Sequence, residues 1–161
     1  MKDTADKDHS GNDPDNDRKA RMGLLARAAA GRVPALLDAA LGPDGRPAFE
    51  WLRAPEIGSV MVRGRAGGTG APFNLGEMTV TRCALTLAGG AIGHACIQGR
   101  RKDDATAAAL VDALMQTDAA GTLRATVLDP LRAEAAARRT GRAEKAAATK
   151  VDFFTLVRGE D

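Results

Sequence analysis

Aromatic side chains are scarce in this sequence. Only 3% of its 161 residues are aromatic, with one tryptophan, four phenylalanines and no tyrosine, although the hydrophobic content of 44% is ordinary for a globular protein. Much of the apolar content is alanine, as in the runs 28–30 and 107–109. Because alanine buries little area, at roughly 25 cal/mol per Å², we expect a single thin core that is partly completed against a partner.

Long apolar runs are also missing. No stretch approaches the roughly 18 residues that cross a bilayer, and the first residues are acidic and polar, unlike the basic and then apolar start of a secretory signal. We therefore expect a cytoplasmic protein with no membrane contact. In that compartment the two cysteines, Cys83 and Cys96, are expected to be free thiols.

Charge is nearly balanced overall but uneven along the chain. The formal net charge of +2 gives no indication of a nucleic-acid partner, and we expect none. Residues 1–17 carry six aspartates against two lysines and are expected to form a disordered acidic tail. Residues 124–150 carry seven lysines or arginines against three acidic residues. A solvated helix face is the simplest interpretation of this basic segment, with an acidic partner or a polyphosphate as the alternative.

The length and the periodicity predict one α+β domain over residues 18–161, with an antiparallel sheet flanked by N-terminal and C-terminal helices. Helical spacing begins at Arg18 and again at Val33. Two strands are expected over 49–53 and 57–65, separated by Pro55.

A hairpin is predicted where two alternating runs flank Gly89-Gly90. A two-residue loop fixes the register and would place one set of side chains on a common face. The predicted pairs are Leu87 with Ile92, Leu85 with His94, and Cys83 with Cys96. Met78 and Val80 have the opposite parity, so a β-bulge or a strong bend is expected near residues 81–82.

Helices are predicted after the hairpin. Asp103 or Asp104 is placed to cap a helix whose apolar positions recur at 107, 110, 111 and 114. A further helix is expected through 123–131, and Asp129 would cap a last helix that is weakened at Gly141. The C-terminal segment 151–159 is predicted to be an aromatic arm that docks on its own sheet or on a partner.

The glycine-rich stretch "GGTGAPFNLGEMTVTR", residues 67–82, precedes a strand. A Walker loop would end in Gly-Lys-Ser/Thr and lead into a helix, and a dinucleotide loop would need a third glycine where Phe73 stands. The stretch is therefore expected to be a flexible connection between strands or, alternatively, an anion-binding nest. Residues near enough in sequence to line such a nest are Arg63, Arg65, Thr69 and Arg82.

Other chemical sites are poorly supported. Cys83, His94 and Cys96 share the predicted hairpin face, but no CxxC or HxxxH spacing accompanies them, so we interpret them as buried thiols and a core histidine. Buried thiols have a raised pKa and are inert. Glu56 and Glu77 have no feature that brings them together. A small thiol enzyme stays open as an alternative, but catalysis by this chain alone is not favoured.

Three separated segments carry a family resemblance. "RAPEIGSVMVRGRAGGTGAPFNLGEMTVTRCALTL", "GHACIQGRRKDDATAAALVDALMQ" and "KVDFFTLVRGE" together resemble the PhnG family, the G subunit of the bacterial carbon–phosphorus lyase system. The similarity covers roughly residues 18–159, in order, and leaves out only the acidic tail.

The resemblance implies a role in phosphonate catabolism within a core complex that also contains H, I and J subunits, of which the I subunit is the most direct partner. In that family a phosphonate oxygen displaces adenine from C1′ of MgATP, the complex acting as α-D-ribose 1-methylphosphonate 5-triphosphate synthase. It implies no catalytic residue, no metal site and no cofactor of this chain's own, MgATP being the substrate of the complex. The alternative is an independent phosphate- or nucleotide-binding module.

Under this resemblance the glycine loop and the C-terminal arm become contact surfaces for a partner subunit, with phosphate contact as a secondary role. The candidate residues for these contacts are Arg63, Arg65, Gly67, Gly68, Thr69, Gly70, Phe73, Asn74, Glu77, Arg82, Phe153, Phe154 and Arg158.

Overall fold

The computed structural model describes residues 14–42 and 45–149, and it has the predicted α+β class. The elements are α1 (Pro14–Ala26), α2 (Arg32–Leu41), β1 (Phe49–Arg65), η2 (Ala66–Gly68), β2 (Pro72–Leu87), β3 (Ile92–Gln98), α3 (Lys102–Leu114), α4 (Ala120–Leu123), η3 (Arg124–Leu128) and α5 (Asp129–Ala148). The predicted tail falls largely outside the described residues, and α1 already begins at Pro14, before the boundary expected at Arg18.

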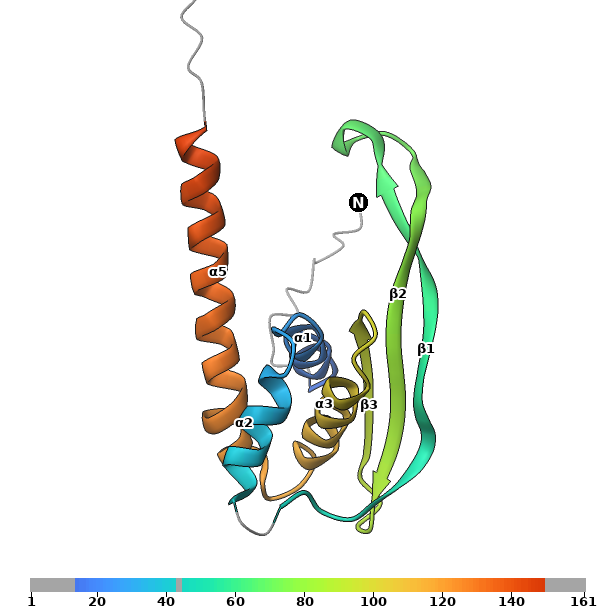
Figure 1. The fold of residues 1–161 in the computed structure, drawn as a ribbon, viewed down its shortest axis with the longest axis vertical. Helices are drawn as coiled ribbons and strands as arrows, with labels where there is room; N and C mark the ends of the chain where they lie inside the picture. The colour runs from blue at the N-terminus through green and yellow to red at the C-terminus, as the bar shows by residue number, and fades with distance from the viewer. Residues whose placement is uncertain (1–13, 43–44, 150–161) are drawn as a thin grey trace, which may run out of the picture.

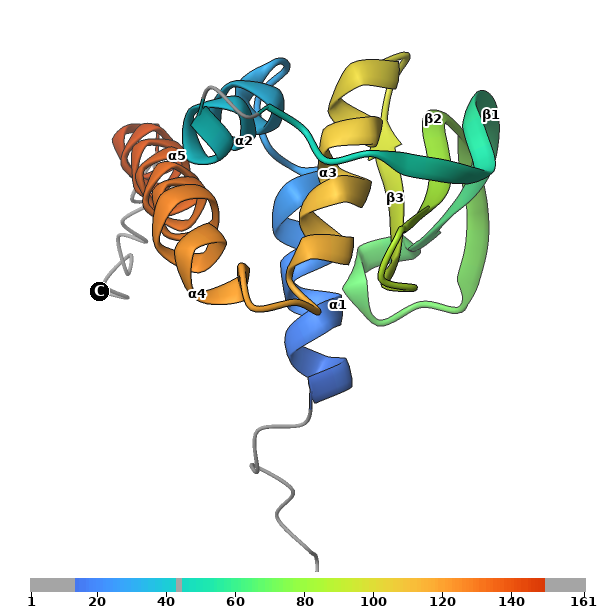
Figure 2. The ribbon, with the colours of Figure 1, turned by 90° about the horizontal axis from the view of Figure 1, so that it is seen from below.

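The helices lie on one side of a three-stranded antiparallel sheet of order β1-β2-β3 (Figure 1). Seen from below, α3 lies next to β3, α1 and α2 lie beyond it, and α5 lies on the side away from the sheet (Figure 2). The two ends of the described chain are therefore helical, as the sequence predicted.

The alanine-rich helix α3 lies at the centre of the core. Ala105, Ala107 and Ala109 are fully buried, and Leu110 and Val111 join them against the sheet. Small side chains let a helix approach a sheet closely, and the strand residue under α3 is Gly93, where an added Cβ would collide with the backbone of Ala109 and Ala113. The apolar positions predicted at 107, 110, 111 and 114 are buried, and the burial extends to the other sides of the helix, with Ala108, Asp112 and Ala113 buried as well.

The two strands predicted around Pro55 are one strand. β1 runs without interruption from Phe49 to Arg65, so the prediction of a break was wrong. Pro55 lies at a register shift in the pairing of β1 with β2, where Ala54 and Pro55 together oppose a single residue, Cys83. A second register shift lies at Leu52. Proline is compatible with an edge strand, because the N–H group that it lacks is not needed there for pairing with a neighbouring strand.

The predicted register between β2 and β3 was wrong by one residue. Leu85 faces Gly93, and Cys83 faces Ala95. The connection is one residue longer than predicted, because the Leu87 N–H donates to the Ala91 carbonyl while the Gly90 N–H donates to the Leu87 carbonyl. Gly90 has φ +81°, the left-handed residue that closes a three-residue loop with a bulge.

The bulge or strong bend expected near residues 81–82 is not a bulge in β2 itself, but an irregularity lies beside it, where Ala54 and Pro55 of β1 oppose Cys83. β2 and β3 pair continuously from Val80 to Thr86, and the register shifts lie between β1 and β2 instead. Thr81 is fully buried because its hydroxyl donates to the Gly99 carbonyl at 2.6 Å and accepts from the Arg101 N–H at 3.0 Å. The buried hydroxyl of Thr81 is thus satisfied by the backbone that follows β3.

The two helix-cap predictions were also wrong. Asp103 and Asp104 lie inside the first turn of α3, which begins after Arg101, and Asp104 accepts a hydrogen bond from the Gly31 N–H at 2.9 Å. Asp129 caps nothing because the preceding residues of η3 are already helical, and α5 continues through Gly141 to Ala148.

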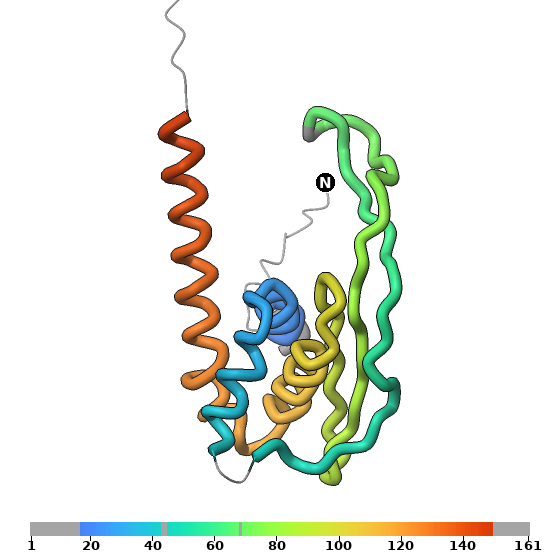
Figure 3. Tube along the Cα trace, viewed as in Figure 1, coloured from blue at the N-terminus to red at the C-terminus, as the bar shows by residue number. Residues whose placement is uncertain are grey.

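β2 extends far beyond β3. Residues 72–79 of β2 pair only with residues 59–65 of β1, and the loop 66–71 joins them at the end away from α1, α2 and α3 (Figure 3). We call residues 59–79 the ribbon. No side chain of its two strand segments is buried.

Candidate functional site

The loop of the ribbon is held by its own backbone and one arginine. Ala66–Gly68 form a single 3₁₀ turn in which Gly67 has φ 59°, and the Gly70 N–H donates to the Ala66 carbonyl at 2.9 Å. The Arg65 guanidinium donates to the Gly70 carbonyl at 3.1 Å. At least one N–H group of the Arg65 guanidinium therefore holds the two ends of the loop together.

Most of the predicted contact residues do gather on the ribbon. Arg63 pairs with Asn74, and Phe73 lies opposite Gly64, one step from the loop. Glu77 lies further along β2 and pairs with Met61. Gly67, Gly68, Thr69 and Gly70 form the loop itself.

Arg82 does not belong to this group. It lies ten residues beyond Pro72 on β2, which at about 3.3 Å per residue is roughly 30 Å from the loop. Its Nε donates to Glu56 Oε1 at 2.6 Å across the strands. The hypothesis that Arg82 and the loop line one anion nest was therefore wrong.

The ribbon exposes apolar side chains. Met61 is 52% exposed, Phe73 45% and Leu75 67%. Large apolar residues that stay in water together on an extended segment mark an interaction surface more often than isolated ones do. The ribbon therefore has the character of a protein-binding surface.

The cysteines and the histidine do not form one cluster. Because of the shifted register, Cys83 is buried under α3 while His94 and Cys96 point to the exposed face of the sheet, so their interpretation as core residues was wrong. Burial raises the pKa of the Cys83 thiol to about 11, and its Sγ donates to the Ala105 carbonyl at 3.2 Å. Cys83 is thus an inert core residue, as predicted.

The described residues contain neither a metal-binding cluster nor a membrane-spanning helix. Among residues 14–42 and 45–149, no three histidine, cysteine or acidic side chains are grouped so that they could hold a metal ion. Within the same ranges, no helix has the length and apolar character that a bilayer span requires.

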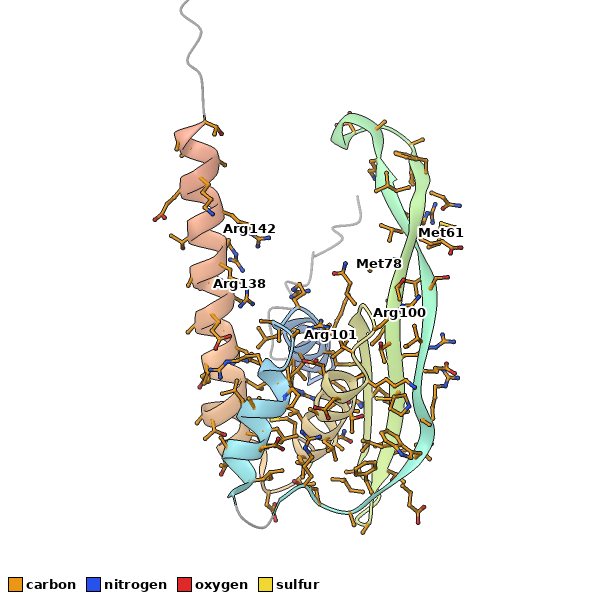
Figure 4. All side chains as sticks on the ribbon, viewed as in Figure 1. Met61, Met78, Arg100, Arg101, Arg138 and Arg142 are labelled. Atoms are coloured by element: carbon orange, nitrogen blue, oxygen red, sulfur yellow. The ribbon has the colours of Figure 1, made fainter. Side chains whose placement is uncertain are left out.

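An arginine-rich cleft of about 740 Å³ lies between α1, the end of β3 and α5. Its basic lining residues are Arg27, Arg101, Arg132, Arg138, Arg139 and Arg142. In Figure 4, Arg138 and Arg142 extend from α5 toward the side of the molecule on which Arg101 lies. We call this feature the arginine cleft.

Comparison with known proteins identifies the family. The family model described as phosphonate metabolism protein PhnG matches residues 16–159. A relative from Rhizobium meliloti (strain 1021) is 44% identical over 144 residues, which is 89% of this chain and 90% of the relative, and is named α-D-ribose 1-methylphosphonate 5-triphosphate synthase subunit PhnG.

The chain belongs to the PhnG family. The PhnG match contains β1 through α5, with the ribbon and the arginine cleft among them. It also contains Phe153, Phe154 and Arg158, which lie outside the described residues, so the predicted arm stays a prediction.

Sequence reasoning on this PhnG chain missed the arginine cleft. It noted the basic character of 124–150 but not that Arg27 and Arg101, from other parts of the chain, face the same space. A signal was present in α5, where Arg132, Arg139 and Arg142 recur at helical spacing around Ala135 and Ala136. The opposing residues could not be found without the fold.

Proposed function

We propose that this chain is a subunit of a ribose 1-methylphosphonate 5-triphosphate synthase and acts in the cytoplasm together with the H, I and J subunits of the carbon–phosphorus lyase core complex. Two findings support the proposal: the high identity to a protein named as a subunit of this synthase, and membership of a family of phosphonate metabolism proteins.

The proposed reaction takes place in the complex. An oxygen of the phosphonate forms a bond to C1′ of MgATP, the bond from C1′ to the purine nitrogen breaks, and adenine leaves with the electron pair and takes up a proton. The product is a ribose 1-phosphonate that keeps the 5-triphosphate. This chain supplies contacts that complete the complex, and we expect no turnover by it alone.

The ribbon is the observation that carries the subunit role. No side chain of its strand segments is buried, Phe73 and Leu75 are exposed, and it extends away from the chain's own core. A two-stranded segment is marginally stable in water by itself. Contact with a partner would remove its apolar surface from water and stabilise it.

The assembly test uses a tagged full-length chain expressed in its native host. We expect the H, I and J subunits to co-purify with it. The double variant Phe73→Ser, Leu75→Ser should reduce the recovered partners at least tenfold, since both side chains leave the ribbon surface. Ile92→Ser is the matched control, because Ile92 is 40% exposed but lies on β3, outside the ribbon.

A second variant tests the arm. Deletion of residues 151–161 should remove the I subunit from the purified material, and assembly that is unchanged would rule the arm out. A wild-type chain that purifies alone and converts a phosphonate and MgATP without partners would contradict the subunit role itself.

The alternative of an independent nucleotide module needs the glycine loop and the basic helix to hold one ligand. In Figure 1 the ribbon loop belongs to the extension of the sheet and α5 to the helices on the other side, and the two elements are separate. No observation brings these two elements together, so we do not favour a shared site.

A further inference from the structure

We propose that the arginine cleft binds the triphosphate group of a nucleotide-like ligand. The inference depends on the proposed function in one respect only, namely which compound carries the triphosphate. Both MgATP and the ribosyl product of the proposed reaction contain one. The affinity of the cleft for a polyphosphate chain is a property of this chain's own residues.

The charge around the cleft is the first step of the argument. Six arginines line it and no aspartate or glutamate does. Like charges gathered around one space repel each other and weaken the fold unless counter-charge is present. The cleft therefore has a strong electrostatic preference for an anion.

Internal ion pairs neutralise only part of this charge. Three of the six arginines have a carboxylate partner: Arg132 with Asp129 at 2.7 Å, Arg138 with Glu134 at 3.8 Å and Arg101 with Asp104 at 3.9 Å. Glu134 is shared, because Arg32 donates to the same carboxylate at 2.7 Å.

The other three arginines are Arg27, Arg139 and Arg142. Within the part of the chain that the structure describes, none of these three has a carboxylate within 4.0 Å. Their guanidinium groups therefore bring the cleft an excess of positive charge, which an external anion can compensate.

The walls of the cleft are held in place. Arg101 is only 21% exposed, and its guanidinium donates to the Ala28 carbonyl at 3.1 Å and to the Gln98 carbonyl at 3.0 Å, which fixes it between α1 and β3. On the other wall, α5 presents Arg132, Arg139 and Arg142 at helical spacing. A ligand in the cleft can thus meet guanidinium groups from two sides without rearrangement of the backbone.

The size and chemistry of the cleft favour a polyphosphate over a single phosphate. A volume of about 740 Å³ lies within the range of nucleotide-sized sites. Arginine binds phosphate oxygens in pairs through its planar fork, so several arginines on two walls match a chain of phosphates better than a compact ion. Leu24, Ala135 and Ala136 add apolar surface that the sugar or base of a nucleotide can cover.

The test measures binding by calorimetry to the full-length chain at low ionic strength. The probes are inorganic tripolyphosphate, MgATP and AMP. The cleft variant is Arg139→Gln, Arg142→Gln, and the matched control is Lys19→Gln, Arg53→Gln, which makes the same change in net charge at two exposed cations on α1 and β1 that do not line the cleft. Circular dichroism establishes that each variant is folded.

We expect the wild-type chain to bind tripolyphosphate and MgATP, and to bind AMP at least tenfold more weakly. Hydrogen bonds between charged partners are stronger than neutral ones, so losing two arginines should weaken binding of both triphosphates by tenfold or more. The control variant should stay within about twofold. MgATP binding that is tighter than that of tripolyphosphate would identify the nucleotide as the source, and equal affinities would support recognition of the phosphates alone.

Two results would overturn the inference. One is that wild-type and cleft variant bind tripolyphosphate equally or not at all. The other is that the cleft variant keeps its affinity for tripolyphosphate but loses its co-purifying subunits, which would assign the arginines to an acidic partner surface. Because tripolyphosphate binding is measured without partners, its failure is distinct from a failure of the proposed subunit role.

Discussion

Arg18 of α1 holds Asp112 of α3 by two hydrogen bonds, one from Nε at 3.1 Å and one from Nη2 at 2.7 Å. Asp112 is fully buried, and it also accepts from the Arg21 guanidinium at 3.1 Å and from the His94 N–H at 3.1 Å. A single carboxylate thus links α3 and the neighbouring strand β3 to α1, which is distant from both in sequence.

Replacing this carboxylate should destabilise the fold strongly. Asp112→Asn leaves Arg21, whose side chain is 7% exposed, without its nearest buried counter-charge. Breaking a buried pair in this way costs about 3–5 kcal/mol. Asp38→Asn is the control, because Asp38 pairs with Arg46 at the surface with its side chain 56% exposed, and less than about 1 kcal/mol is expected there. Urea denaturation at pH 7 measures both, and equal losses would contradict the role given to Asp112.

The same carboxylate predicts a dependence of stability on pH. Burial alone would raise the pKa of Asp112, but hydrogen bonds from Arg18, the His94 N–H and Arg21 together lower it below its ordinary value of 3.8. Since the folded pKa lies below the unfolded one, this contribution is complete above the unfolded value and is lost as pH falls toward the folded value. The difference in unfolding free energy between wild-type and Asp112→Asn should therefore be constant from pH 6 to 8 and shrink below about pH 4. A difference that grows on acidification would be inconsistent with this account.

Gly93 is predicted to be intolerant of any side chain. A Cβ there would overlap the carbonyl of Ala109 and approach the Ala113 nitrogen at 2.9 Å, both of which are helix backbone. Gly93→Ala must push α3 away from β3, and such overpacking costs about 1–3 kcal/mol or more. Gly58→Ala is the matched strand control, since nothing lies within 4 Å of its Cβ position. Thermal unfolding followed by circular dichroism should separate the two variants clearly.

Gly141 should behave in the opposite way. It lies inside α5 with nothing within 4 Å of its Cβ position, and its φ is not positive. Glycine inside a helix is less favourable than alanine by about 0.8–1 kcal/mol. Gly141→Ala should therefore raise the unfolding free energy by an amount of this order, and a loss of stability would show that α5 is not a continuous helix at this point.

The two thiols should differ in reactivity. Cys96 is exposed, whereas Cys83 is buried with its pKa raised to about 11. A thiol reagent applied to the native protein at pH 8 should modify one cysteine per chain rapidly and the second only in denaturant, because the thiolate is the reactive form. Cys96→Ser should abolish the rapid phase. Rapid modification of Cys83 in the native chain would reopen the thiol-enzyme alternative.

Local periodicity was enough to predict the helices and the sheet. The face of α3 could be predicted because its apolar positions follow the helical period, and the end of α2 could be predicted from Gly42. Local patterns could not predict the register between β2 and β3. The shift between β2 and β3 depends on the left-handed conformation of Gly90 rather than of a Gly-Gly pair, and it moved His94 and Cys96 to the exposed face.

The sites show the same limit. Ribbon residues such as Arg63 and Phe73 are close in sequence and also close in space, so sequence reasoning grouped them correctly. Arg82 was grouped with them by sequence distance alone, and the extended strand carries it away. Arg27 and Arg142 are 115 positions apart in the sequence, and only the packing of α1 against α5 brings them to one cleft.

Because β2 extends beyond the end of β3, the protection of its backbone amides against hydrogen exchange should fall in steps along this one strand. Amides between Val80 and Thr86 belong to a three-stranded, helix-covered region and should exchange only on global unfolding. Amides of residues 73–79 depend on β1 alone and should exchange by local opening, many times faster. The protein therefore keeps a rigid body at one end and a labile extension at the other, and a binding partner would be detected first as slowed deuterium uptake at that extension.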